Sequence, residues 1–198
     1  MKRLRHISMV ALVLVLGSTI VSGQILKYDV FLFGKKIGET IVEMKDSAGI
    51  KLYYLHNTSR VKFLFWDKKF NLSGRVVVGR DGLMTVSTFE NIKETGSSVT
   101  KSVWDKDKLI IIDRNGDKRT LTDAVKFPSI LLYFFEPHDL KKFFYEPKGA
   151  YFEIKKEAEG LYTGQVSNHS DRYTYDKGKL IQVEFKNTFG SILMKLVN

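Results

Sequence analysis

The 198-residue sequence contains no cysteine. Disulfide bonds, thiol catalysis and thiolate metal sites are therefore excluded, and so is a lipid anchor on an N-terminal cysteine. Without disulfides the chain depends on its hydrophobic core, and a chain of this length can bury a large one.

Proline is also scarce, with three residues, whereas aromatic residues make up 13% of the chain. This composition argues against disorder and against a linker-rich multidomain protein. The formal net charge is +10, and the basic pairs are spread along the chain. Such a spread is typical of a solubilising surface; the alternative is attraction to an anionic partner such as lipid headgroups.

Residues 1–23 have the pattern of a secretory signal peptide. Three basic residues lie within the first five, an apolar run covers residues 9–16, and small residues follow. The apolar run is too short for a comfortable transmembrane helix. We expect a mature protein that begins near Gln24, forms one β-rich domain over residues 24–198, has no transmembrane anchor and works in the periplasm or outside the cell.

From residue 25 onward, apolar and polar residues alternate in short segments separated by Gly, Asn and Asp turns. This period is typical of half-buried strands, and Leu26, Tyr28 and Val30 share one such face. The strongest turn signal, Asn115-Gly116, predicts a type I′ hairpin. About a dozen such segments without strand–helix alternation predict an all-β, mainly antiparallel fold. We expect a single curved sheet or an up-and-down barrel, with a two-sheet sandwich left open.

The alternation breaks at residues 125–135 and 139–145, on either side of Pro137. Both segments are too apolar for a solvated loop. We expect a short helical or irregular, aromatic-rich segment that covers the sheet. Asp139 is expected to cap a short helix over residues 140–145.

Three parts of the chain resemble a family of secreted bacterial proteins known only as a domain of unknown function. The residues that carry the resemblance are Tyr28-Asp29-Val30 with Gly34-Lys35-Lys36-Ile37-Gly38, then residues 129–134 with Glu136-Pro137, and finally Tyr173-Thr174-Tyr175, Gly178-Lys179-Leu180 and residues 188–192. The family is similar in outline to periplasmic, antiparallel, barrel-like proteins. The resemblance therefore implies that fold, and it implies no catalytic residue.

The sequence shows no recognised catalytic or metal motif. His56, His138 and His169 lie in separate segments, without further ligands at metal-site spacing. The Gly-x-Ser-x-Gly motif of hydrolases and a glycine-rich phosphate loop are both absent. We therefore expect no metal, no cofactor and no catalytic residue, and we expect a protein that is not an enzyme.

Aromatic residues are the one unusual resource of the sequence. They gather in two stretches, and the simplest interpretation is that they form the hydrophobic core. The alternative is that some of them line an apolar cavity, with lysines that pair a ligand headgroup. The candidate ligand-binding residues are Phe63, Phe65, Trp66, Leu132, Tyr133, Phe134, Phe135, Lys126 and Lys142.

Three hypotheses for function follow. The first is a binding module for lipid or another apolar or anionic amphipathic molecule of the cell envelope. The second is a structural or scaffolding envelope protein that docks on a protein partner through an apolar patch or a sheet edge. The third and least supported is a hydrolase with a dispersed site. An exported location argues against nucleic acid as a partner.

Overall fold

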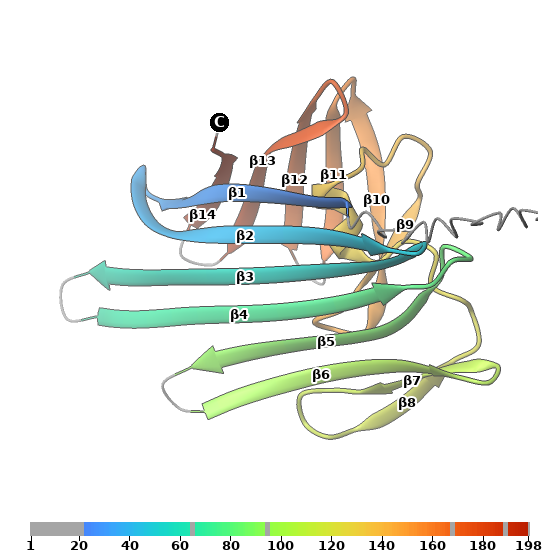
Figure 1. Cartoon of the computed structure of the whole chain (residues 1–198). Coiled ribbons are helices and arrows are strands. Elements are labelled where there is room, and N and C mark those ends of the chain that lie inside the picture. Colours follow the sequence, from blue (N-terminus) through green and yellow to red (C-terminus); the bar gives the residue numbers. More distant parts are fainter. Residues whose placement is uncertain (1–21, 64–65, 94–95, 167–168, 188–189, 198) are drawn as a thin grey trace, which may run out of the picture.

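A computed structural model describes residues 22–63, 66–93, 96–166, 169–187 and 190–197 (Figure 1). These residues form fourteen strands in one sheet and one short 3-10 helix. The elements are β1 (Ser22–Leu32), β2 (Lys35–Ser47), β3 (Ile50–Phe63), β4 (Trp66–Val78), β5 (Met84–Lys93), β6 (Gly96–Asp105), β7 (Lys108–Ile112), β8 (Lys118–Leu121), η1 (Ser129–Tyr133), β9 (Lys142–Tyr145), β10 (Ala150–Ala158), β11 (Leu161–Val166), β12 (His169–Asp176), β13 (Lys179–Asn187) and β14 (Gly190–Leu196).

The sheet is antiparallel throughout, and its strands follow the chain from β1 to β8 and from β9 to β14. The two runs meet where β1 pairs with β14, with Tyr28 opposite Leu196. In Figure 1, β1–β6 lie across the view whereas β10–β12 stand steeply, so the sheet curls strongly. The all-β prediction with a single curved sheet is confirmed.

The two edge strands, β8 and β9, approach each other without pairing as neighbours in the sheet. The Arg119 guanidinium of β8 donates hydrogen bonds to the carbonyls of Lys148 and Gly149, in the turn after β9. The segment between β8 and η1 lies along β9, where the Phe144 N–H donates to the Phe127 carbonyl at 2.9 Å. Side chains and this segment therefore join the edges, and the closed shape is barrel-like.

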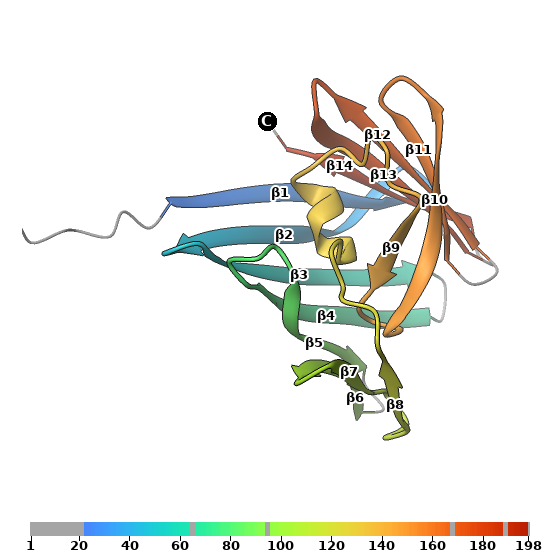
Figure 2. The same cartoon turned by 90° about the vertical axis from the view of Figure 1, so that its right-hand side faces the viewer.

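The predicted cover segment lies inside the curl of the sheet. Figure 2 shows η1 between the β1–β5 half and the β9–β14 half. Ile130, Leu131 and Leu132 of η1 are buried, and the Tyr175 hydroxyl donates to the Leu132 carbonyl at 2.7 Å. A run that is apolar on every face cannot lie on a surface with one side in water, which explains its enclosure.

The segment after η1 departs from its prediction. The helix expected over residues 140–145 is wrong, because residues 142–145 form β9 and pair with β10. Phe143 and Phe144 are both buried although they are adjacent. The Phe143 ring lies near Phe152 on one face of β9, and the Phe144 ring lies near Tyr151 on the other. The Tyr151 hydroxyl donates to the Ala124 carbonyl, so that second face is covered as well and a strand buries both rings.

The predicted hairpin at Asn115-Gly116 joins β7 and β8, but its turn is longer than type I′. Gly116 has a positive φ of 87°, and Asn115 is not among the residues with positive φ. The Asp113 carboxylate accepts hydrogen bonds from the N–H groups of Asn115 and Asp117 at 2.8 and 3.1 Å. These side-chain bonds stabilise the wider turn, so type I′ is wrong.

The leader predicted over residues 1–23 lies mostly outside the described residues, which begin with β1 at Ser22. The leader and the start of the mature chain at Gln24 stay predictions. Within the described ranges, no helix has the length and apolar character needed to cross a bilayer.

Candidate ligand cavity

A cavity of about 520 Å³ lies on the concave side of the sheet. Strands β1–β5, β13 and β14 supply its walls, and Tyr133 at the end of η1 contributes from the interior. The lining comprises Val30, Ile37, Thr40, Leu55, Asn57, Ser59, Val61, Phe70, Asn71, Leu72, Asn91, Tyr133, Phe185, Ile192 and Met194. The volume is within the range of about 300–1,000 Å³ that is usual for small-molecule sites.

Strand register explains why these side chains share one space. Thr40 of β2 lies opposite Asn57 of β3, and Asn57 lies opposite Leu72 of β4. Leu72 in turn lies opposite Asn91 of β5. Because residues opposite one another in a sheet point to the same face, one row of mixed polarity crosses four strands of the cavity wall.

The next row toward the core is apolar and includes a glycine. Leu55 lies opposite Gly74, and Gly74 lies opposite Phe89. A Cβ atom added to Gly74 would be 2.4 Å from an atom of the Phe89 ring. The absence of a side chain at Gly74 therefore lets the Phe89 ring lie flat against the wall.

One side of the cavity holds a chain of hydrogen bonds. The Ser59 hydroxyl donates to Asn57 Oδ1 at 3.3 Å, and Asn57 Nδ2 donates to Thr40 Oγ1 at 2.7 Å. The Thr40 hydroxyl then contacts Met194 Sδ at 3.9 Å as a donor. These polar groups satisfy one another, so this side is stable without a ligand.

The opposite side differs. Asn91 lines the cavity, and its carboxamide forms no hydrogen bond with another described residue. Asn71 lies between Phe70 and Leu72 on β4, so its carboxamide points to the other face of the sheet. None of the described lining residues carries a charge. The cavity therefore offers apolar walls together with the amide group of Asn91, which can donate to and accept from a ligand.

A second, smaller cavity of about 90 Å³ lies deeper, beside η1. It shares the side chains of Leu55, Leu72, Tyr133 and Phe185 with the large cavity. Tyr145 and other aromatic side chains complete its wall. The large cavity thus ends on an aromatic floor.

Glu146 lies at this closed end and is fully buried. Its carboxylate accepts the N–H groups of Ser129 and Ile130 at 3.0 and 3.2 Å, and also the Ser129 hydroxyl. Burial raises the pKa of Glu146 to about 7, although these hydrogen bonds oppose the shift. Glu146 therefore fixes the start of η1.

Asp171 of β12 is the other buried acid, and 7% of its surface is exposed. It lies opposite Phe185 of β13, and burial raises its pKa to about 7. Burial and the charge of Asp171 together raise the pKa of Tyr145 and Tyr173. In the part of the chain that the structure describes, no three His, Asp or Glu side chains gather so as to hold a metal ion.

The structure brings two of the predicted candidate residues to the cavities. Tyr133 lines both, and Leu132 lines the small one. Phe134 packs on Tyr53 with ring centroids 5.4 Å apart, and Phe135 is exposed with Lys51 over its ring. Neither Phe134 nor Phe135 is part of the lining.

The two predicted lysines lie elsewhere. Lys126 and Lys142 border a separate surface depression, together with Asp139 and Tyr151, and the Lys142 ammonium lies 4.6 Å from the Tyr151 ring centroid. Phe63 ends β3 and Trp66 begins β4, while Phe65 falls outside the described residues. The structure therefore does not bring the nine candidates to one site.

Sequence reasoning did not identify the polar lining residues. Asn57 and Asn91 are 34 residues apart and belong to no motif. The signal that could have found Asn57 is its spacing of two and four residues from Leu55 and Tyr53, which puts a carboxamide on an otherwise apolar face.

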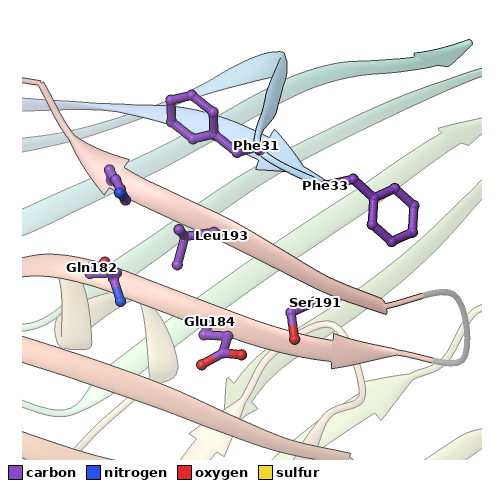
Figure 3. Close-up of a pocket in the computed structure, with 8 residues that line it drawn as sticks. Phe31, Phe33, Gln182, Glu184, Ser191 and Leu193 are labelled. Carbon is purple, nitrogen blue, oxygen red and sulfur yellow. The ribbon is translucent and has the colours of Figure 1, made fainter.

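A second hollow lies on the convex side of the sheet, over β1, β13 and β14 (Figure 3). Phe31 and Phe33 reach it from the end of β1, Gln182 and Glu184 from β13, and Leu193 from β14. It is an open groove of about 570 Å³ with little enclosure by side chains. The exposed Phe33 ring and the open shape of the groove suit contact with a surface better than retention of a small ligand.

A model of the DUF6134 family, a domain of unknown function, matches residues 28–197. The chain belongs to this family. The match spans all fourteen strands except the start of β1, so the DUF6134 domain and the described fold coincide. None of the curated proteins matches the chain.

A solved structure has a fold similar to that of this DUF6134 domain over most of its length. It is the crystal structure of a β-barrel-like protein of the domain of unknown function DUF1849 from Brucella abortus. The similarity covers 91% of this chain and 97% of that chain, with a TM-score of 0.58 and 12% sequence identity. The likeness is one of fold, and it agrees with the barrel-like closure described above.

Proposed function

We propose that this DUF6134 domain is a binding module of the bacterial cell envelope that holds an amphipathic molecule, with the apolar chain inside the large cavity. The observation that carries the proposal is the cavity of about 520 Å³, whose described lining is uncharged and mostly apolar. The leader-like pattern of residues 1–23 supports the envelope as the location.

The lining favours one orientation of the ligand. Burying an unpaired charge is costly, so a charged head does not enter an uncharged cavity. The aromatic floor at Tyr133 and Phe185 suits the end of an apolar chain. Asn91 is then placed to hydrogen-bond the first polar group that follows the chain.

The test is a fluorescence titration with N-phenyl-1-naphthylamine, followed by displacement with dodecanoate. Ile192 lines the cavity, and the adjacent Leu193 lines the convex groove. Ile192→Trp fills the cavity and should weaken probe binding at least tenfold. Leu193→Trp is the matched control and should leave binding within twofold. Absence of probe binding by the parent protein, or equal loss in the two folded variants, would contradict the proposal.

The convex groove favours a second candidate function, docking on a protein partner of the envelope. Phe33, at its border, is 71% exposed, and the half-buried Phe31 and Leu193 extend the apolar surface of the groove. The same pair of variants separates the two functions. If the groove docks a partner, chemical cross-linking in cells should join an envelope protein to the parent and to Ile192→Trp. The same cross-link should be lost in Leu193→Trp.

A further inference from the structure

Positive charge gathers at one end of the barrel. β3 and β5 end at the same side of the sheet, as their arrowheads in Figure 1 show, and β2 and β4 begin there. Six exposed lysines at these strand ends and at the end of β13 form what we name the basic collar: Lys35, Lys62, Lys68, Lys69, Lys93 and Lys186. Asp67, which lies between Lys62 and Lys68 in the sequence, is bound by the Arg60 guanidinium at 2.7 Å and lies 3.9 Å from the Lys62 ammonium.

The other end of the barrel is balanced in charge. The connection between β6 and β7 alternates Asp105, Lys106, Asp107 and Lys108. In the connection between β4 and β5, the basic Arg80 is followed directly by the acidic Asp81. The charge asymmetry therefore follows the barrel axis and is more than a solubilising spread of lysines.

The basic collar also surrounds the mouth of the large cavity. All six of its lysines lie within two residues of a lining residue, so the strands that build the wall carry the lysines just beyond it. The pairs of lysine and lining residue are Lys35 with Ile37, Lys62 with Val61, Lys68 and Lys69 with Phe70, Lys93 with Asn91, and Lys186 with Phe185.

Apolar side chains are exposed between these lysines. Phe33 is 71% exposed, Phe70 is 44% exposed and Ile92 is 40% exposed, and all three lie at the same strand ends as the collar. Lysines next to exposed apolar groups suit an anionic bilayer, where the ammonium groups meet lipid headgroups and the apolar groups enter the interface. A soluble acidic polymer would use the charges and leave the apolar groups in water.

We propose that the basic collar docks this domain on an anionic lipid bilayer, with the cavity mouth facing the headgroups. The proposal rests on the proposed function in one respect, namely that the bilayer is the source of the ligand that enters the cavity. The docking itself needs the collar and the exposed apolar groups, and it does not need a filled cavity.

The test is flotation with vesicles of phosphatidylcholine that contain about 30% phosphatidylglycerol, compared with pure phosphatidylcholine. We expect binding to the anionic vesicles that falls as salt rises, because surface charges are screened. A collar variant, Lys35→Gln with Lys69→Gln and Lys93→Gln, should lose about two orders of magnitude in partition coefficient, since each lysine near an anionic surface contributes about tenfold or less.

The matched control replaces three exposed lysines remote from the collar, Lys108→Gln with Lys155→Gln and Lys179→Gln, and should keep most of the binding. Equal loss in the two triple variants would overturn the collar as a docking surface, and so would equal binding to both kinds of vesicle. Binding of polyphosphate without binding of anionic vesicles would overturn the bilayer as partner in favour of an acidic polymer.

The same assay separates this inference from the proposed function. Ile192→Trp should retain vesicle binding while it loses the naphthylamine probe. Vesicle binding by a parent protein that fails to bind the probe would leave docking intact and contradict the cavity. Probe binding without vesicle binding would contradict the docking and leave the cavity intact.

Discussion

Glu146 is buried with three hydrogen-bond donors but no cationic partner among the described residues. Its carboxyl titrates near 4.5 in an exposed state and near 7 in the folded protein, because burial disfavours the charge. A folded-state pKa above the unfolded value means that the contribution of this group to stability is full below pH 4.5 and is lost as pH rises through 7. Burial also raises the pKa of Asp171 to about 7, so its contribution to stability is lost over the same rise in pH.

We therefore predict that the free energy of unfolding falls between pH 5 and pH 8, by up to about 1.4 kcal/mol for each unit by which a pKa is raised. Glu146→Gln should reduce this fall, and adding Asp171→Asn should reduce it further. Urea unfolding at the two pH values measures the effect. Glu153→Gln, at an exposed position on β10, is the control and should behave as the parent. An unchanged pH dependence in the double variant would contradict the assignment.

A second prediction at the scale of a single residue concerns Gly74. Gly74→Ala should destabilise the protein by about 1–3 kcal/mol, because the new methyl group overlaps the Phe89 ring. Phe89→Leu in the same chain should recover part of the loss, since a smaller side chain leaves room. Thermal unfolding of the two single variants and of the pair gives the coupling. Additive losses would show that the two side chains do not compete for space.

The 3-10 helix η1 presents neighbouring side chains to different surroundings. Tyr133 lines both cavities and meets Tyr28 edge-on, with ring centroids 5.5 Å apart. Phe134, which follows the helix, packs on Tyr53 outside the lining. One element thus supplies both a cavity wall and core contacts.

This division predicts separable effects. Phe134→Ala should cost about 2–4 kcal/mol of stability and leave probe affinity within twofold, because Phe134 packs in the half-buried core. Tyr133→Ala should change the probe dissociation constant several-fold, because it alters the cavity wall. Probe titration and urea unfolding of both variants decide the matter. A strong loss of affinity in folded Phe134→Ala would place Phe134 in the binding site.

Most elements could be predicted from local pattern. Alternation identified the strands because one face of each meets the core, as with Leu26, Tyr28 and Val30. The pattern failed at residues 140–145, where a strand buried on both faces shows no alternation. It also missed the turn after β7, where the Asp113 carboxylate decides the geometry.

The site was less predictable, because its walls come from the two ends of the chain. Residues of β1–β5 meet residues of β13 and β14 through the β1–β14 pairing, and this pairing leaves no trace in local pattern. The aromatic clustering pointed to η1, and Tyr133 does line the cavity. Lys126 and Lys142 were chosen for charge alone, and nothing in the sequence tells on which side of the sheet a loop lysine lies.

The closure of the whole molecule depends on a small number of contacts between β8 and the turn after β9. Arg119 makes two hydrogen bonds there, and both acceptors are backbone carbonyls. The sheet edges could open at this place without breaking any pairing between neighbouring strands.

We predict that Arg119→Ala loosens this junction at a cost of about 1–3 kcal/mol. Amide hydrogen exchange in β8 and in residues 146–149 should rise at least tenfold, while exchange in β2 and β3 stays unchanged. Arg114→Ala, in the exposed turn between β7 and β8, is the control. A rise spread evenly over all strands would show a global loss of stability instead.

The central claim is that the interior of the barrel holds an amphipathic molecule. Native mass spectrometry of the protein purified from its own cells tests it most directly, with solvent extraction of whatever is bound. The account predicts a single adduct of amphiphile mass on the parent and on Leu193→Trp, and none on Ile192→Trp. A parent protein that carries no adduct under gentle ionisation, or an adduct equally abundant on Ile192→Trp, would contradict it.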